Sequence, residues 1–215
     1  MFQPPDAESV PEKPFLYGFS RKSLTIMRIT GGQARGIPLT LPKGDKVRPA
    51  TDALRQAVFS SLAARVPGAR FLDLFAGSGA YGLEALSRGA SGGAFVEKDA
   101  RTAAFIRDNL TAVCKSLGRG LDDLQVVNAD ATKVVPGEAP DLVFVDPPYD
   151  IIAEVAPAIF SRLAEFQAAK PDILVIFEMP GDQELAPVGW TAAKRLGKGG
   201  RQPTAVIFKP SPASP

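Results

Sequence analysis

Two short strings of this sequence contain residues that could do chemistry, and each follows an apolar run typical of a buried strand. Residues 75–79 read Phe-Ala-Gly-Ser-Gly, and residues 146–149 read Asp-Pro-Pro-Tyr. Glycines let the backbone turn sharply into a helix with free amide groups facing a ligand. A carboxylate, stiff prolines and an aromatic ring at a strand exit can hold a planar amine. Together the two strings indicate transfer of a methyl group to the amino group of a planar molecule the size of a nucleobase.

The second string supplies the groups that would hold the amine. We expect Asp146 and the carbonyl of Pro147 to accept hydrogen bonds from it, Pro148 to stiffen the loop, and Tyr149 to stack on the base. Such stacking contributes about 1 to 3 kcal/mol. A base within a duplex cannot reach this pocket, so the target is flipped out or already unpaired. The alternative is a proline-rich turn without function.

The first string predicts a binding site for the methyl donor. In an open parallel sheet, ligands bind at the carboxyl ends of the strands, where the strand order reverses. Asp73, Phe75, Gly77 and Gly79 lie at such a strand end. Amides near the helix start would favour a methionine carboxylate, and Asp73 could hold a cationic group. A nicotinamide or flavin site is the alternative, because many nucleotide-binding folds share this turn.

Two further acidic residues favour the methyl donor. Glu97 lies eighteen residues after Gly79 at the end of a second predicted strand, where a carboxylate can accept both hydroxyls of a ribose. Asp130 follows a third predicted strand and could accept from an adenine amino group, with the backbone of Ala131 donating to the ring. The alternatives are an ordinary acidic residue near a helix start for Glu97 and a helix cap for Asp130.

Composition excludes several classes of function. The chain has 215 residues, one cysteine and no histidine, which excludes an internal disulfide and argues against zinc chemistry and Ser-His-Asp catalysis. No apolar run reaches the roughly 18 residues of a membrane helix, and the first residues do not resemble a signal peptide. We therefore expect a cytoplasmic protein with no metal site and no membrane segment.

Basic residues are concentrated near the start of the chain. Residues 21–55 contain eight Lys and Arg side chains against two Asp, although the net charge of the whole chain is only +2. We expect Arg28, Arg35, Arg48 and Arg55 to contact the phosphates of a nucleic acid. A solvated surface without a partner is the alternative.

The hydrophobic pattern predicts one α/β domain preceded by a small hairpin. Residues 1–26 have no sustained period and are expected to be disordered. The pattern predicts a basic β-hairpin over residues 27–50, the main domain over residues 51–210, and a tail over residues 211–215. Alternation of strands and helices predicts a doubly wound, mostly parallel sheet with an antiparallel last strand. The expected strands are 70–75, 92–97, 123–128, 141–145, 172–178, 190–196 and 204–208, and the expected helices are 51–65, 79–88, 99–117 and 151–166.

On four stretches the sequence resembles the RsmD family of bacterial 16S rRNA guanine-N2 methyltransferases. These stretches are residues 27–36, 48–52, 71–79 and 146–149. The resemblance implies a class I, Rossmann-like methyltransferase fold, S-adenosylmethionine as cofactor, and a guanine of 16S rRNA as acceptor, within the 30S subunit or an assembly intermediate. It also implies that the donor binds on Asp73, Gly77, Gly79, Glu97 and Asp130 and the base at residues 146–149. We separately expect a monomer.

Other functions share parts of this pattern. An adenine-N6 DNA methyltransferase uses the same amine-holding tetrapeptide, but the 66 residues between Gly79 and Asp146 leave no room for an inserted domain that reads duplex sequence. A protein-glutamine methyltransferase would not need the basic segment. A non-catalytic RNA-binding module with a relic donor site is the remaining alternative, and the intact residues of both strings argue against it.

Overall fold

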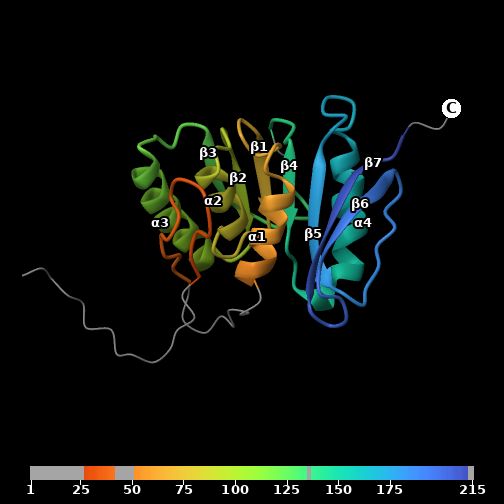
Figure 1. Ribbon diagram of the computed structural model, residues 1–215. Coiled ribbons are helices and arrows are strands. Elements are labelled where there is room, and N and C mark those ends of the chain that lie inside the picture. The colour runs from red at the N-terminus through yellow and green to blue at the C-terminus, as the bar shows by residue number, and fades with distance from the viewer. Residues whose placement is uncertain (1–26, 42–50, 135–136, 213–215) are drawn as a thin grey trace, which may run out of the picture.

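The computed structural model describes residues 27–41, 51–134 and 137–212, which form one layered α/β unit (Figure 1). The predicted disordered extension at residues 1–26, the second half of the predicted hairpin segment with Arg48, and the last three residues lie outside this part of the chain. The elements are α1 (Thr51–Ser61), β1 (Arg70–Leu74), α2 (Ala80–Ser87), β2 (Gly92–Glu97), α3 (Ala100–Leu117), β3 (Leu124–Asn128), β4 (Leu142–Val145), η1 (Tyr149–Ile151), α4 (Ile152–Ala164), β5 (Leu174–Pro180), β6 (Trp190–Gly197) and β7 (Pro203–Pro210).

All seven strands form one sheet, in the order β3-β2-β1-β4-β5-β7-β6. The first five of these are parallel to one another, and β7 is antiparallel to both β5 and β6. The predicted doubly wound sheet with an antiparallel last strand is thus confirmed. The chain order reverses between β1 and β4, which is where an open α/β sheet places its ligand.

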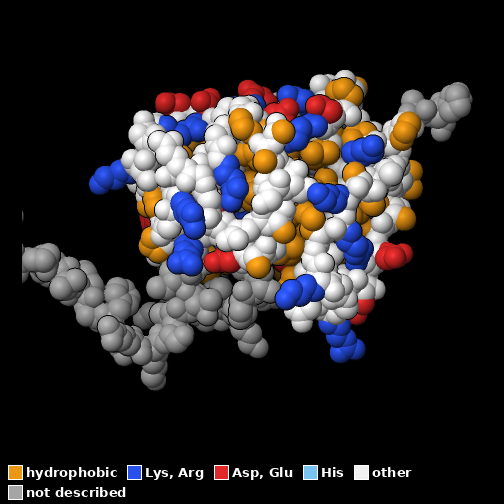
Figure 2. All heavy atoms as spheres, in the orientation of Figure 1, with side chains coloured by type: hydrophobic (Ala, Val, Ile, Leu, Met, Phe, Trp, Pro, Cys, Tyr) orange, Lys and Arg blue, Asp and Glu red, His pale blue; other side chains and the backbone are white. Residues whose placement is uncertain are grey.

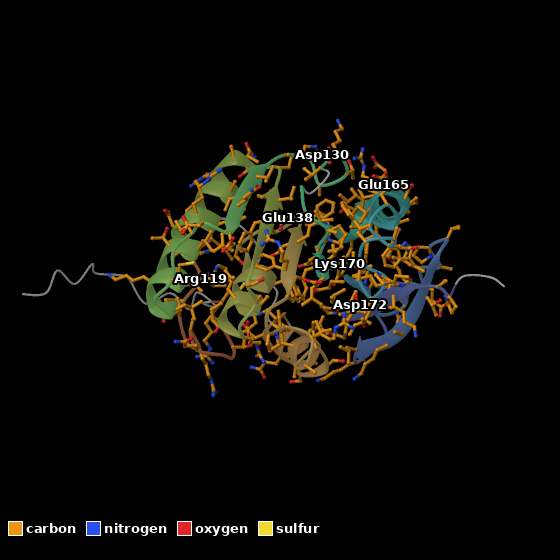
Figure 3. The ribbon with its side chains drawn as sticks, turned by 90° about the horizontal axis from the view of Figure 1, so that it is seen from above. Arg119, Asp130, Glu138, Glu165, Lys170 and Asp172 are labelled. Atoms are coloured by element: carbon orange, nitrogen blue, oxygen red, sulfur yellow. The ribbon has the colours of Figure 1, made fainter. Side chains whose placement is uncertain are left out.

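Two apolar layers cover the two faces of the sheet. One face packs on α1, α2 and α3 through residues such as Phe59, Leu83 and Ile106, and the other packs on α4 through residues such as Phe160. Side chains of a strand alternate between the faces, so Phe144 belongs to the first layer and its neighbours in β4 to the second. The view from above shows the sheet lying between α1 and α4 (Figure 3).

The predicted hairpin after residue 26 is reduced to a single bridge within residues 27–41. Arg28 pairs with Pro38 in an antiparallel bridge, and Ile29 donates from its amide to the Ile37 carbonyl at 3.0 Å. The proline cannot donate a ladder bond, which keeps the pairing short. The segment between these two ends is a glycine-containing turn, as the sequence indicated.

Buried polar side chains of two helices fix this N-terminal segment to the domain. The Glu84 carboxylate, on α2, accepts from the amide and hydroxyl of Thr30 at 2.7 and 2.8 Å. Asn109, on α3, accepts from the amide of Thr40 at 2.9 Å and donates to its carbonyl at 3.0 Å. Residues 27–41 therefore lie against α2 and α3 (Figure 1).

The helices and strands predicted after residue 50 are all present. Strand β2 has the predicted bounds, and the other strands differ from prediction by one or two residues at an end. The helix expected over residues 51–65 ends as an α-helix at Ser61 and continues in turns. The two C-terminal strands form the expected antiparallel hairpin.

Candidate active site

A cleft of about 830 Å³ opens at the carboxyl ends of the parallel strands, where the chain order reverses. Residues that follow β1, β2, β3 and β4 line it, together with Met27 and Leu41 of the N-terminal segment. Nine of the predicted donor and acceptor residues line this cleft: Asp73, Phe75, Gly77, Glu97, Asp130, Ala131, Asp146, Pro147 and Pro148. The structure therefore brings the predicted donor and acceptor residues into one cavity.

The glycine-rich turn after β1 has the backbone conformation that requires glycine. Phe75, Gly77 and Gly79 have φ angles of 58°, 53° and 79°, a region where side chains are strained. Gly79 is the N-cap of α2, and a Cβ there would lie 3.2 Å from Ile106. Gly79 is thus needed to pack the turn, although it is not among the described residues that line the cleft.

Two amides of this turn are bound within the protein. The Gly77 amide donates to the Glu97 carboxylate at 3.0 Å, and the Gly79 amide donates to the Ala76 carbonyl at 2.7 Å. The expectation that amides near the helix start favour a ligand carboxylate therefore does not apply to these two and stays a prediction for the rest of the turn. The glycines also let the backbone come close to a ligand.

Glu97, at the end of β2, is half-buried at the cleft wall. One carboxylate oxygen accepts from the Gly77 amide and the other from the Asp99 amide at 2.9 Å. Each carboxylate oxygen can accept more than one hydrogen bond, so these contacts orient the group and leave capacity for a ligand hydroxyl. Asp99, not Glu97, is the N-cap of α3.

Asp130 shapes a turn and lines the cleft, and its bond to an adenine amine remains a prediction. One oxygen accepts from the amide and hydroxyl of Thr132 at 3.0 and 2.7 Å, which shapes the turn after β3. These bonds lower the pKa of Asp130, first through the Thr132 hydroxyl. Asp130 also lines the cleft beside Ala131, on the side of the sheet away from α1 (Figure 3).

Asp73 is buried at the end of β1 and accepts from the Gly82 amide at 2.9 Å, which ties β1 to α2. Burial raises its pKa to about 8, and the nearby Glu97 charge adds to the shift, whereas the Gly82 bond opposes it. A positive charge in the cleft would favour the ionised form of this carboxyl. The prediction that Asp73 lies where a cationic group could bind is consistent with its place in the lining.

The acceptor string lies across the cleft from the glycine turn. Asp146 follows β4 and is half-buried, Pro147 is buried, and Pro148 is exposed at the rim. Tyr149 begins η1 and is half-buried, and it packs against the apolar layer on the α4 side. Stacking of Tyr149 on a base remains a prediction, because this ring is not among the described residues lining the cleft.

Glu178 is a cleft residue that the sequence analysis missed. It lies in β5, is only 2% exposed, and accepts from the Tyr81 hydroxyl at 2.8 Å. Burial of Tyr81 and the charges of Glu178 and Asp146 raise the pKa of this tyrosine well above its usual value. The signal available was a lone acidic residue within the apolar run 173–179, where an unpaired carboxylate would be costly.

The predicted RNA-contacting arginines fall into different environments. Arg28 and Arg35 are exposed on the N-terminal segment, and Arg48 lies outside the described residues. Figure 2 shows Lys and Arg side chains spread over one face of the molecule, with acidic side chains gathered along its upper edge. The exposed positions of Arg28 and Arg35 are compatible with phosphate contact.

Arg55 is a correction to that set. It is 1% exposed, donates to the Arg28 carbonyl at 2.8 Å and pairs with Asp52 at 2.7 Å. Its Nε also lies 3.5 Å from the Glu84 carboxylate. The predicted surface contact with phosphate is therefore wrong for Arg55, because these bonds fix it inside the protein at the cleft wall.

The charges of the cleft favour a cationic ligand. The described lining contains two basic side chains, Arg55 and Lys98, and five acidic ones besides Asp73, whose raised pKa leaves it largely protonated near pH 7: Glu97, Asp130, Asp146, Glu154 and Glu178. A pyrophosphate-containing dinucleotide would be repelled by this balance, whereas a positively charged sulfonium would be attracted. The nicotinamide or flavin alternative is thereby disfavoured.

The described residues contain neither a metal-binding cluster nor a helix able to span a membrane. Within residues 27–41, 51–134 and 137–212, no cluster of three or more His, Cys, Asp or Glu side chains could hold a metal ion. In the same part of the chain, none of the helices is long and apolar enough to cross a membrane.

Similar proteins agree with this geometry. The profile of the family described as "Conserved hypothetical protein 95" matches residues 27–206. Ribosomal RNA small subunit methyltransferase D of Haemophilus influenzae is 34% identical over 180 residues, which cover 80% of this chain and 89% of that protein. The protein of the same name from Escherichia coli is 41% identical over 125 residues, 57% of this chain and only 60% of the relative's length.

Solved structures resemble this one over most of its length. The yhhF protein of Escherichia coli has a TM-score of 0.67 at 28% identity, with 86% of this chain and 98% of that chain covered. A hypothetical protein of Thermus thermophilus has a TM-score of 0.62 at 31% identity, with 86% and 100% covered. The chain has the class I methyltransferase fold and belongs to the RsmD family.

Proposed function

We propose that this protein transfers a methyl group from S-adenosylmethionine to the exocyclic N2 amine of a guanine in 16S rRNA of the small ribosomal subunit. The observation that carries the proposal is the shared cleft. Asp146 and Pro147, at the end of β4, line the same cavity as Gly77, Glu97 and Asp130. Residues that can accept hydrogen bonds from an amine thus lie beside residues that can bind a nucleoside with a positively charged tail.

The donor half of the cleft fits the cofactor in charge and in hydrogen-bonding groups. S-adenosylmethionine, when bound, supplies a methyl group on a positively charged sulfonium. Glu97 would accept from the ribose hydroxyls, Asp130 from the adenine amine, and Asp73 would face the cationic part. The acidic lining offsets the positive charge, which supports binding of this cofactor over a phosphate-rich one.

The acceptor half of the cleft would make the amine of the base a better nucleophile. The lone pair of an aromatic amine is delocalised into the ring, which makes it a weak nucleophile. Hydrogen bonds from the amine to Asp146 and the Pro147 carbonyl would turn the lone pair toward the donor half of the cleft. The Asp146 carboxylate would also stabilise the positive charge that develops on nitrogen, an electrostatic contribution that needs no rearrangement of the protein.

The N-terminal segment would hold the RNA. Arg28 and Arg35 are exposed on residues 27–41, which reach the cleft through Met27 and Leu41. Phosphate contacts of this kind fix position without reading sequence. The named relatives act on small-subunit rRNA, and we propose the same substrate here, within the 30S subunit or an assembly intermediate in the cytoplasm, for a protein that acts as a monomer.

Nucleoside mapping tests this proposal in the cell. The gene is deleted, and modified nucleosides of 16S rRNA are mapped by digestion and mass spectrometry, with a complemented strain as control. We expect loss of one N2-methylguanosine and its return on complementation. An unchanged set of N2-methylguanosines, or loss of a methylated adenine, would contradict the proposal.

A further inference from the structure

Glu178 lies within β5 beside the end of the neighbouring strand β4, which Asp146 follows. Strands β4 and β5 are parallel, with Val145 opposite Phe177. Asp146 and Glu178 each come one residue later, and both line the cleft. Glu178 is 2% exposed, so its carboxylate faces the cavity from inside the protein and not from the rim.

The two carboxylates also point toward the same face of the sheet. Ile176 belongs to the layer on the α1 side, and Glu178, two residues further along β5, points the same way. The charges of both Glu178 and Asp146 act on Tyr81, a residue of α2 that packs in this layer. The Tyr81 hydroxyl donates to Glu178 at 2.8 Å, and its ring stacks on Phe144 with centroids 5.2 Å apart. Because Tyr81 is itself buried, this bond holds Glu178 in a fixed position beside Asp146.

We propose that Glu178 reads the N1–H of the target guanine while Asp146 holds its N2 amine. The proposal rests on the proposed function, in which the acceptor is a guanine amine. Guanine presents N1–H and the N2 amino group next to each other on its Watson–Crick edge, so two neighbouring donors meet two neighbouring acceptors. An ionised carboxylate accepts only, which makes the pair Asp146 and Glu178 complementary to this edge.

The same pair disfavours adenine. With its N6 amine at Asp146, adenine places the N1 lone pair next to the amine, and this lone pair would face the Glu178 carboxylate. Two acceptors then meet without a proton between them, inside a buried site where such a mismatch is costly. Glu178 thus supplies a physical basis for choosing guanine, which the Asp146–Tyr149 string alone does not supply.

The probe for this role is 2-aminopurine, which keeps the amine at C2 but carries a lone pair instead of a proton at N1. It replaces the target guanine, once that guanine is mapped, in 16S rRNA assembled into 30S particles. We expect the wild-type protein to methylate guanine at least about 100-fold more efficiently than 2-aminopurine, since sites built around a substrate N–H reject analogues that lack it. Equal rates on the two substrates would overturn the role of Glu178.

The variant Glu178→Gln sharpens the test. Its amide can donate to the N1 lone pair of 2-aminopurine, so we expect the preference for guanine to fall at least about 10-fold. The control is Glu154→Gln, which removes an exposed carboxylate from the same cleft and should keep the wild-type preference. An unchanged preference in Glu178→Gln would contradict the proposal, and if this variant does not fold, the wild-type comparison still decides.

The outcomes separate this inference from the proposed function. If the wild-type protein methylates guanine N2 but does not prefer guanine over 2-aminopurine, the role of Glu178 is contradicted and the proposed function is not. Absence of any guanine N2 product would sink the proposed function itself. The affinity for S-adenosylmethionine, measured by calorimetry, should be the same in wild type and Glu178→Gln within about twofold, because Glu178 lies in β5, beyond the strands whose ends line the donor half.

Discussion

The donor half of the cleft, at the ends of β1, β2 and β3, and the acceptor half, after β4 and within β5, hold their carboxylates in different ways. In the donor half, Asp130 is bound by Thr132, two residues away, and Glu97 by the amides of Asp99, two residues away, and Gly77, 20 residues away. In the acceptor half, Glu178 is held by Tyr81, 97 residues away in sequence. One half is shaped largely by local turns, whereas the other depends on the packing of the whole sheet.

This difference has consequences for solvent and charge. Asp130 and Glu97 are half-buried, so water screens their charges and a ligand can approach them at the surface. Glu178 and Tyr81 are buried, where an unmatched hydrogen bond is costly. The donor half is therefore suited to binding a cofactor reversibly, and the acceptor half to discriminating between bases.

The largest expected effect separates the two halves by function. Asp146→Asn keeps the shape of the acceptor loop but removes the charge, and we expect transfer to 30S particles to fall about 10²- to 10³-fold. Affinity for S-adenosylmethionine, measured by calorimetry, should stay within about twofold of wild type. Weakened donor binding with unchanged turnover of the bound complex would show that Asp146 belongs to the donor half.

Asp73 is the exception in the donor half, because it is buried like Glu178. Its raised pKa makes the stability of the protein depend on pH. Its pKa of about 8 in the folded protein exceeds the value of 3.8 expected when unfolded. The folded state therefore keeps a proton that the unfolded chain loses, and this stabilisation is complete below pH 4 and lost as pH rises through about 8.

We expect the free energy of unfolding to fall by about 1 kcal/mol per pH unit between pH 5.5 and 7.5. Asp73→Asn, which keeps an acceptor for the Gly82 amide, should flatten this dependence. Urea unfolding at several pH values, with and without the substitution, provides the measurement. Identical slopes in the two proteins would show that Asp73 is not the titrating group.

A matched pair of substitutions compares long-range and local hydrogen bonds. Tyr81→Phe leaves the buried Glu178 carboxylate without its hydroxyl donor, and we expect a loss of about 1 to 3 kcal/mol in stability. Thr132→Val removes only the hydroxyl bond to Asp130 and keeps the amide bond, so the loss should stay within about 0.5 kcal/mol. Equal losses in urea unfolding would remove the distinction between the two halves.

The smallest effect concerns the basic segment beside the cleft. Neutralising Arg28 and Arg35 together to Gln should weaken binding to 16S rRNA and reduce the slope of log affinity against log salt by about 1.4, or 0.7 for each contact with single-stranded RNA. Lys194→Gln, on the exposed edge strand β6, is the control and should change neither quantity. If the double variant keeps the wild-type slope of log affinity against log salt, the basic segment is a solvated surface that does not contact RNA.

The sequence predicted the donor half better than the acceptor half, for a physical reason. Strand ends, glycine turns and the carboxylates just after them are local patterns, so Gly77, Glu97 and Asp130 could be named together with their strands. Glu178 gave no such pattern, since its role depends on the register of β5 beside β4 and on a tyrosine from α2. The burial of Arg55 could not be predicted from the sequence for the same reason, because Glu84 and the Arg28 carbonyl contact it only in the folded chain.

The most direct test of the account uses purified protein, 30S particles lacking this modification, and S-adenosylmethionine labelled on the methyl group. After the reaction, the RNA is digested to nucleosides and the labelled product is identified by mass spectrometry. We predict that the label enters one nucleoside, N2-methylguanosine, and that Asp146→Asn lowers the rate of its appearance about 10²- to 10³-fold. Label in N6-methyladenosine, or in ribosomal protein instead of RNA, would contradict the account.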